Sequence, residues 1–175
     1  METIIAVTGH RPGKLNKEYD YIGPYSDYLR KRIKKVLLDR QPVRTISGMA
    51  LGVDTIFAQV SLELKIPLLA AIPFIGQESQ WPQKSQDLYN RILNHPLVTS
   101  HIVCEGPYNS AKMQIRNEFM VDEASLLIAC WNGTLGGTMN CVRYAEKQKN
   151  KEIFYINPEG WKIDQAQIDP QPQLF

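Results

Sequence analysis

The sequence has 175 residues, of which 43% are hydrophobic and 22% are charged, and its formal net charge is +2 at pH 7. This hydrophobic share excludes a chain that is disordered throughout, and the length fits one globular domain better than two. A net charge so close to zero argues against nucleic acid as the main partner, because proteins that grip its backbone usually carry a larger basic excess.

Several other classes of protein are disfavoured. No apolar run reaches the roughly 20 residues that a membrane-spanning helix requires, and the first residues, Met1-Glu2-Thr3, lack the basic flank and apolar core of a secretion signal. Cys104, Cys130 and Cys141 are odd in number and form no C-x-x-C pair, so neither a disulfide framework nor a zinc site is indicated. We expect a cytoplasmic protein with no metal ion, no cofactor and no membrane partner.

Short apolar segments alternate with longer amphipathic segments along the chain. The apolar segments predict strands at residues 4–7, 43–46, 68–72, 101–104, 126–131 and 153–156. Between them, amphipathic patterns predict helices at 28–39, 54–64, 85–93, 112–123 and 139–147. This alternation predicts an α/β fold with a doubly wound, mostly parallel sheet and helices on both faces.

Two segments fit neither pattern. Residues 11–23 contain several Pro, Gly and Asn residues and are too polar for a core element, although Tyr19, Tyr21 and Tyr25 in and after them suit either a mobile lid or an interface patch. The end of the chain is rich in Gln and Pro. We therefore expect residues 1–160 to form a single domain and residues 161–175 to form a C-terminal tail.

Three glycine-bearing sequences follow predicted strands, at the sheet edge where open α/β sheets bind ligands. The first is Thr8-Gly9-His10-Arg11, in which Gly9 allows close approach of a ligand to the backbone while His10 and Arg11 supply donors and positive charge. The alternative is an ordinary turn at the end of a strand with a solvated arginine.

The second and third sequences each lead into a predicted helix. In residues 47–54, amides near Gly48 and Gly52 are candidates for binding an anion at the helix end, and Asp54 either caps the helix or accepts hydrogen bonds from a ribose. In residues 131–140, three glycines precede Thr138, which can cap the helix while nearby amides bind a phosphate; the alternative is a loop with flexible glycines.

A fourth cluster lies on the helix predicted at 112–123. Arg116 and Met120 lie on one face and Glu118 and Asp122 on another. An arginine directed to the sheet edge can hold a phosphate or carboxylate through two hydrogen bonds, whereas the alternative is an ion pair on the helix surface.

Together these four sequences resemble the SLOG superfamily of Rossmann-like proteins, and in particular its YpsA-like branch. The resemblance implies a nucleotide-derived small-molecule ligand, such as an ADP-ribose or NAD-like molecule, bound by a sensor or sequestering protein that forms a homo-oligomer. It implies ligand contacts at Thr8, Gly9, His10, Arg11, Gly48, Met49, Gly52, Asp54, Arg116, Asn117, Met120, Trp131, Asn132, Gly133, Gly136, Gly137, Thr138 and Asn140.

Two related groups offer alternative functions. LOG-type phosphoribohydrolases carry a glutamate in a Gly-Gly-x-Gly-Thr-x-x-Glu motif, but Cys141 stands at that position here and cannot replace a carboxylate. Glu118 and Asp122 are therefore the candidate catalytic residues of an N-glycosidic hydrolase, with Asp54 as a further carboxylate. The DprA group suggests a nucleic-acid-associated or regulatory partner protein, supported by the basic residues of segment 30–35, which alternatively form a solvated helix face.

Overall fold

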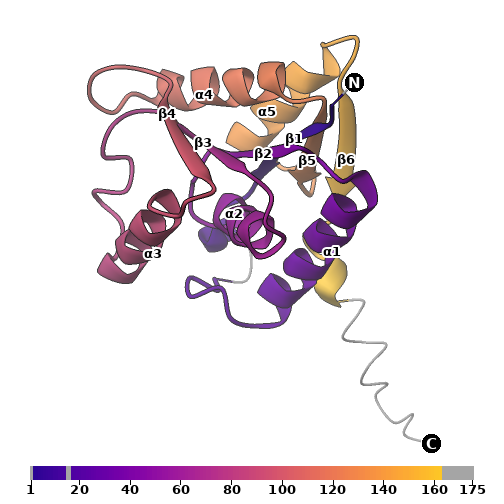
Figure 1. Ribbon diagram of the computed structural model, residues 1–175, viewed down its shortest axis with the longest axis horizontal. Coiled ribbons are helices and arrows are strands. Elements are labelled where there is room, and N and C mark those ends of the chain that lie inside the picture. The colour runs from indigo at the N-terminus through magenta and orange to yellow at the C-terminus, as the bar shows by residue number, and fades with distance from the viewer. Residues whose placement is uncertain (1, 15–16, 163–175) are drawn as a thin grey trace, which may run out of the picture.

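A computed structural model of the chain describes residues 2–14 and 17–162, which form a six-stranded sheet flanked by helices (Figure 1). The strands lie in the order β4-β3-β2-β1-β5-β6, and every neighbouring pair is parallel. Their bounds are β1 (Ile4–Gly9), β2 (Arg44–Ser47), β3 (Leu68–Ile72), β4 (Val98–Ile102), β5 (Leu126–Cys130) and β6 (Glu152–Ile156). The predicted parallel α/β sheet is confirmed.

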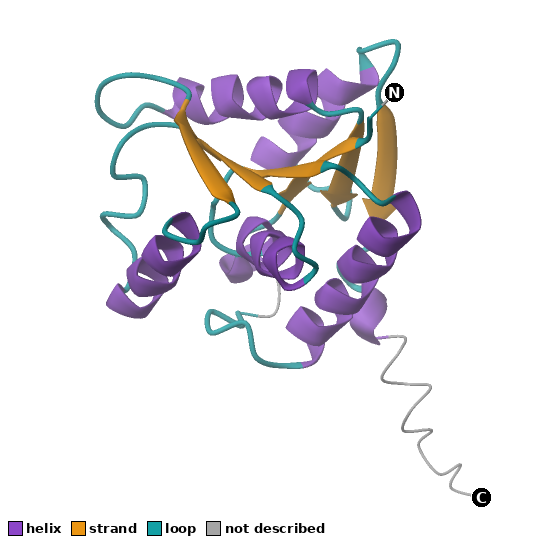
Figure 2. Cartoon of the chain, in the orientation of Figure 1, coloured by secondary structure: helices purple, strands orange, loops and turns teal. Residues whose placement is uncertain are grey.

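Helices cover both faces of the sheet, as predicted (Figure 2). On one face lie α1 (Pro24–Arg40), α2 (Val53–Glu63) and α3 (Gln83–Leu93), and on the other lie α4 (Ser110–Glu123) and α5 (Gly137–Glu146). A short 3-10 turn, η1 (Pro12–Lys14), follows β1. The fold is Rossmann-like and doubly wound.

The apolar runs of the central strands are continuous because each strand is buried on both sides. In β1, Ile5 and Val7 pack into the core cluster with α1 and α2, whereas Ala6 packs into the cluster with α4 and α5. The same alternation divides β5, where Ile128 and Leu127 belong to opposite clusters. Successive side chains point to opposite faces of a strand, so the two helical layers need apolar residues at every position.

The edge strand β4 was predicted three residues too late. Residues 101–104 carry an apolar run, but the strand is Val98–Ile102, and its last four residues are exposed. An edge strand that faces solvent has no continuous apolar run, so the apolar pattern marks its end and the following loop instead.

The polar segment after β1 contributes more to the core than its composition predicts. The buried Tyr21 hydroxyl accepts a hydrogen bond from the Gly52 amide at 3.1 Å, and Tyr25 also lies in the core. The Glu18 carboxylate accepts hydrogen bonds from the amides of Tyr25 and Ser26 at the start of α1. A mobile lid or interface patch is therefore wrong for Tyr21 and Tyr25. The predicted tail, 161–175, lies outside the described residues from residue 163 onward.

The order of the strands places a topological switch point between β1 and β5. The chain proceeds outward from β1 to β4 along one side of the sheet, then returns to β5 on the other side of β1. Connections on the two sides of such a point run over opposite faces, which leaves a crevice beyond the carboxyl ends of the two central strands. Gly9 and the start of α5 lie at that end of the sheet.

Close packing at the end of β1 leaves no room for a side chain at Gly9. A Cβ atom on Gly9 would lie 2.5 Å from Cγ2 and 2.6 Å from Cβ of Val53, in the first turn of α2. Gly9→Ala should lower the free energy of unfolding by about 1–3 kcal/mol, the usual effect of overpacking, as measured by urea denaturation. Gly137→Ala is the matched control, because its Cβ would meet no atom within 4 Å. Equal losses in the two variants would contradict this packing argument.

Candidate functional site

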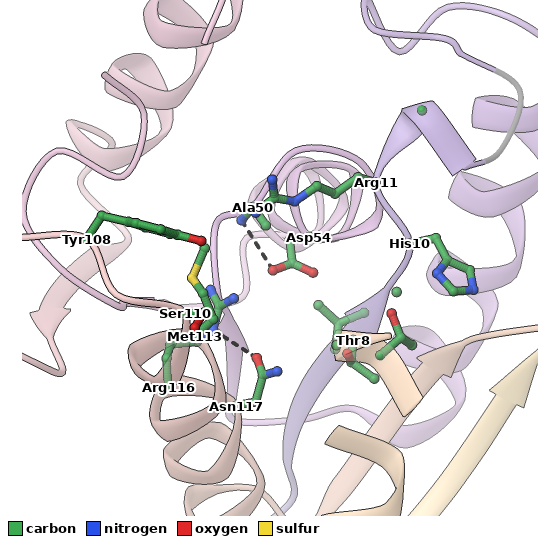
Figure 3. A pocket seen from close by; sticks show the side chains of 15 residues that line it. Thr8, His10, Arg11, Ala50, Asp54, Tyr108, Ser110, Met113, Arg116 and Asn117 are labelled. Atoms are coloured by element: carbon green, nitrogen blue, oxygen red, sulfur yellow. Dashed lines mark hydrogen bonds between the residues drawn. The ribbon is translucent and has the colours of Figure 1, made fainter. Parts of the chain in front are cut away.

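A pocket of about 430 Å³ occupies the crevice beyond the carboxyl ends of β1 and β2. Four parts of the chain line it: the end of β1 with the turn that follows, the β2–α2 loop with the first turn of α2, the segment entering α4 with that helix's first two turns, and the start of α5 (Figure 3). The lining residues are Val7, Thr8, Gly9, His10, Arg11, Gly13, Ala50, Asp54, Tyr108, Ser110, Met113, Arg116, Asn117, Gly137 and Thr138. The volume is within the range of small-molecule sites.

Arg116 connects two walls of this pocket. Its side chain projects from α4, is 5% exposed, and donates from Nη1 to the Gly48 carbonyl oxygen and from Nε to Oδ1 of Asn117 at 3.0 Å. A Cβ atom on Gly48 would overlap the guanidinium, so the glycine leaves the space that the arginine fills. Arg116 is therefore a buried cation fixed by hydrogen bonds, and the predicted alternative of a surface ion pair is wrong.

Asp54 supplies a buried carboxylate beside this guanidinium. Its side chain is 6% exposed, and its Oδ2 accepts a hydrogen bond from the Ala50 amide at 3.2 Å. Burial raises the pKa of Asp54 above its usual value, and the positive charges of Arg116 and Arg11 only partly oppose this effect. Gly52 is the N-cap residue of α2, so Asp54 lies inside the first turn and does not cap the helix.

The amides of the β2–α2 loop are used within the protein. The Met49 amide donates to the Ser47 hydroxyl at 3.1 Å, the Ala50 amide to Asp54, and the Gly52 amide to the Tyr21 hydroxyl. The sequence predicts that amides of this loop bind an anion. The structure contradicts that prediction, because these amides already donate to groups within the protein.

The amide groups at the start of α5 carry partial positive charge, opposite in sign to the carboxylate of Asp54. The first hydrogen bond within the helix runs from the Asn140 amide to the Gly136 carbonyl oxygen at 3.1 Å, so the amides of residues 137–139 precede the helical ladder. Gly136 is the N-cap, and no side chain caps the helix, so the prediction that Thr138 would cap it is wrong. Gly137 and Thr138 line the pocket, and the exposed Arg11 extends over it (Figure 3).

Both candidate catalytic carboxylates lie away from the pocket lining. Glu118 accepts a hydrogen bond from Nε2 of Gln114 at 2.9 Å, and the exposed Asp122 accepts one from the Tyr144 hydroxyl at 3.0 Å. Among the lining residues in the described part of the chain, Asp54 is the only carboxylate. The separate faces predicted for Arg116 and Asp122 on this helix are confirmed.

Other residues predicted to contact a ligand lie near the pocket but outside its lining. Met49 and Met120 are 1% exposed and belong to core clusters. The Trp131 indole donates to the Thr134 carbonyl oxygen at 2.8 Å, which fixes the turn after β5. The remaining residues outside the lining are Gly48, Gly52, Asn132, Gly133, Gly136 and Asn140.

His10 lines the pocket but is held by the turn after β5. Its ring nitrogen Nε2 lies 2.9 Å from Oδ1 of Asn132 and 3.3 Å from Oγ1 of Thr134. These contacts join the turns that follow β1 and β5. Asn132 therefore shapes the pocket by orienting His10, although it does not line the cavity itself.

The sequence did not indicate the wall formed by Tyr108, Ser110 and Met113. Tyr108 comes from the β4–α4 segment, and Ser110 and Met113 come from the first turn of α4; this wall lies on the side of the pocket opposite His10 (Figure 3). The rule that pointed to the loops after the other strands applies equally to this one. The segment after β4 has no motif of the kind that marked the loops after β1, β2 and β5, so it did not stand out in the sequence.

The position of the absent LOG-type glutamate is part of the core beneath the pocket. Cys141 is 0% exposed and interacts with the Thr8 hydroxyl, and burial raises the pKa of its thiol to about 11. The thiol is therefore protonated at neutral pH and is not an activated nucleophile.

No helix within residues 2–14 and 17–162 is long and apolar enough to cross a membrane. Nor do these residues contain a group of three or more His, Cys, Asp or Glu side chains that is placed to hold a metal ion.

Comparison with known proteins supplies the family. The model of the family described as DNA recombination-mediator protein A matches residues 22–167, which is most of the chain. The chain belongs to the DNA recombination-mediator protein A family. Its relatives and structural neighbours agree with the predicted SLOG superfamily, so that placement is confirmed.

Two bacterial relatives match this family member over most of its length. The SPbeta prophage-derived protein YoqJ of Bacillus subtilis is 29% identical over 155 residues, covering 78% of this chain and 85% of the relative. A UPF0398 protein of Bacillus pumilus is 27% identical over 182 residues, covering 98% and 95% of the two chains.

Solved structures share the fold at low sequence identity. DNA processing protein A of Streptococcus pneumoniae has a TM-score of 0.64 at 18% identity, with 95% of this chain covered but only 56% of the pneumococcal one. The Helicobacter pylori protein of that name, described for its single-stranded DNA binding mode, has a TM-score of 0.60 at 17% identity, covering 94% and 73%. A molybdenum cofactor binding protein of Rippkaea orientalis has a TM-score of 0.53 at 14% identity, covering 97% and 86%. The expectation that nucleic acid is not a partner is not confirmed.

The raised pKa of Asp54 makes the stability of the protein depend on pH. Because the pKa of Asp54 is raised in the folded state, the folded protein binds more protons than the unfolded chain above the ordinary value of 3.8. Stability due to this group therefore falls as the pH rises from 3.8 through the raised pKa. Asp54→Asn, which cannot ionise, should match the native protein at low pH and become the more stable of the two as the pH rises.

Urea denaturation over a series from about pH 4 to about pH 8 measures this difference. Asp122→Asn, on the exposed side of α4, is the control and should show no such gain. A constant difference between Asp54→Asn and the native protein across the series would contradict the cost assigned to the buried carboxylate.

Proposed function

We propose that the protein binds a nucleotide-derived small molecule that carries a phosphate and a ribose, and that it acts as a sensor or sequestering protein. One observation carries the proposal: a single pocket combines a buried carboxylate, Asp54, with the amide-bearing start of α5 and the exposed Arg11. A ligand with an anionic group can bind to the amides of α5 and to Arg11, while its hydroxyl groups donate hydrogen bonds to Asp54.

The phosphate binds at the start of α5. The amides of residues 137–139 precede the helical ladder, and the helix dipole adds about half a positive charge at this end. The space beside Gly137 is open to a ligand, since a Cβ built there would meet no atom within 4 Å. Arg11 adds a cationic donor from the turn after β1.

The ribose binds against Asp54. This carboxylate uses Oδ2 to accept from the Ala50 amide, and Oδ1 accepts no hydrogen bond from the described residues. Sugar hydroxyl groups are donors of the required kind, and carboxylates fill this role in other dinucleotide-binding folds. As Asp54 is the only carboxylate among the described lining residues and accepts from the ribose, we propose binding without hydrolysis.

Isothermal calorimetry with AMP, ADP-ribose and NAD tests the proposal. At least one of these ligands should bind, and Arg11→Ala should weaken its binding by about 10- to 100-fold, the effect of losing one charge-assisted hydrogen bond. Arg32→Ala, an exposed arginine on α1, is the matched control and should leave binding unchanged. Folded protein that binds none of the three ligands, or equal effects of the two substitutions, would refute the proposal.

Single-stranded DNA is the second candidate ligand, favoured by the family of the chain and by the Helicobacter pylori neighbour. The basic face of α1 gives this candidate little support, because Arg30 donates to Gln59, Lys34 pairs with Glu63 and Lys35 pairs with Asp39. The exposed Arg11 at the pocket mouth is the more suitable contact for a strand.

Fluorescence anisotropy with a labelled oligothymidylate at physiological salt separates the two candidates. If the small molecule is the ligand, the labelled oligonucleotide should bind weakly. Adding saturating AMP should then leave its anisotropy unchanged. Tight binding that is lost in Arg11→Ala and displaced by AMP would instead show that the pocket accepts a nucleotide within a strand.

A further inference from the structure

The wall of the pocket that the sequence did not reveal carries an exposed aromatic ring. Tyr108 lines the cavity and is 68% exposed, which is unusual for a large side chain at a concave site. Its side chain reaches toward the middle of the pocket with the hydroxyl group foremost (Figure 3). This hydroxyl forms no hydrogen bond with the described residues, so the ring is not placed there by a polar contact.

The ring of Phe74 packs against that of Tyr108. The ring centroids are 5.6 Å apart and the ring planes meet at 77°, an edge-to-face contact. Phe74 is only 6% exposed and is fixed in the protein. Whichever ring presents its edge, at least one face of Tyr108 is left uncovered by this contact. The tyrosine is thus held in position while a flat surface stays open to a ligand.

Met113 lies beside Tyr108 in the same wall, one turn into α4. A thioether is polarisable and makes favourable contacts with aromatic rings. The two side chains therefore form an apolar surface in a pocket whose other walls are polar: Asp54 lies in the middle of the view and Thr8 and His10 lie on the far side (Figure 3).

We propose that the Tyr108–Met113 wall binds an aromatic base of the ligand by stacking. This inference rests on the proposed function. Tyr108 and His10 lie on opposite sides of Asp54 (Figure 3), and His10 contacts the turn after β5 that leads into α5. A molecule with its phosphate at the start of α5 and its ribose at Asp54 therefore directs its third part, the base, toward Tyr108. The ligand class is then a nucleotide with its base intact, and a bare sugar phosphate fills only part of the site.

Calorimetry with AMP and ribose 5-phosphate tests this assignment, because the two probes differ by the adenine base. The native protein should bind AMP at least about tenfold more tightly. Tyr108→Ala should weaken AMP binding by about 5- to 150-fold, the range for the loss of one base–aromatic stack, and leave the affinity for ribose 5-phosphate unchanged. Tyr108→Phe keeps the ring and should retain AMP binding.

Tyr155→Ala is the matched control, since Tyr155 is 48% exposed but lies on β6 outside the pocket. Equal affinities of the native protein for the two probes, or equal losses for both in Tyr108→Ala, would overturn the base-binding role while leaving the sugar-phosphate site intact. Absence of binding by both probes to folded native protein would refute the inference, and failure of ADP-ribose and NAD to bind as well would refute the proposed function with it.

Discussion

The pocket depends on a hydrogen bond between two residues far apart in the sequence, Gly48 and Arg116. The guanidinium fills the space that any side chain at position 48 would need, and it donates to the carbonyl oxygen of that glycine. This contact fixes α4 against the loop after β2, across the crevice at the switch point of the sheet. Since an unpaired buried charge is costly, the nearby carboxylate of Asp54 is the natural electrostatic partner of the guanidinium. Apolar residues would hold the two elements together at less cost, so the retained charges favour a role in binding.

The pocket combines groups of opposite charge. Asp54 lies between Tyr108 on one side and His10 on the other (Figure 3), and the amide groups at the start of α5 and the side chain of Arg11 also line the cavity. Desolvation raises the pKa of the carboxyl, and the amides of the adjoining loop are already used by Asp54, Tyr21 and Ser47. An anion is therefore directed to α5 and not to the glycine-rich loop after β2. The arrangement favours a ligand with distinct anionic, hydroxyl and apolar parts over a simple anion.

The central part of the fold could be predicted from the sequence because burial on both faces leaves a simple signal. The apolar runs of β1, β3 and β5 have the continuous pattern of doubly covered strands, and their positions were predicted within a few residues. The edge strand β4 lacks this pattern because solvent covers one side of it. Tyr21 was also missed, since its burial depends on a hydrogen bond with Gly52, 31 residues away, which local composition does not reveal.

The candidate site was predictable only in part for a similar reason. Glycines, Arg11, Asp54 and Arg116 stand out after strands or at helical spacing, and the structure brings members of all four predicted sequences to one pocket. Which of their atoms face the cavity depends on tertiary contacts. Gly48 and Gly52 use their polar backbone atoms internally, and Met49 and Met120 enter the core. Tyr108 follows the misplaced strand in a loop without a motif, so no local pattern identified it.

Amide chemical shifts of ¹⁵N-labelled protein during titration with AMP locate the bound ligand residue by residue. For a nucleotide site at the carboxyl edge of the sheet, the largest changes should occur at Gly137 and Thr138 and in the turn around Gly9, with smaller ones in α1 and α3. The groove formed by Glu2, Ser125 and residues 147–151 lies at the opposite edge of the sheet and serves as an internal reference. Changes concentrated in that groove, or none at saturating AMP, would contradict a nucleotide site at the carboxyl edge of the sheet.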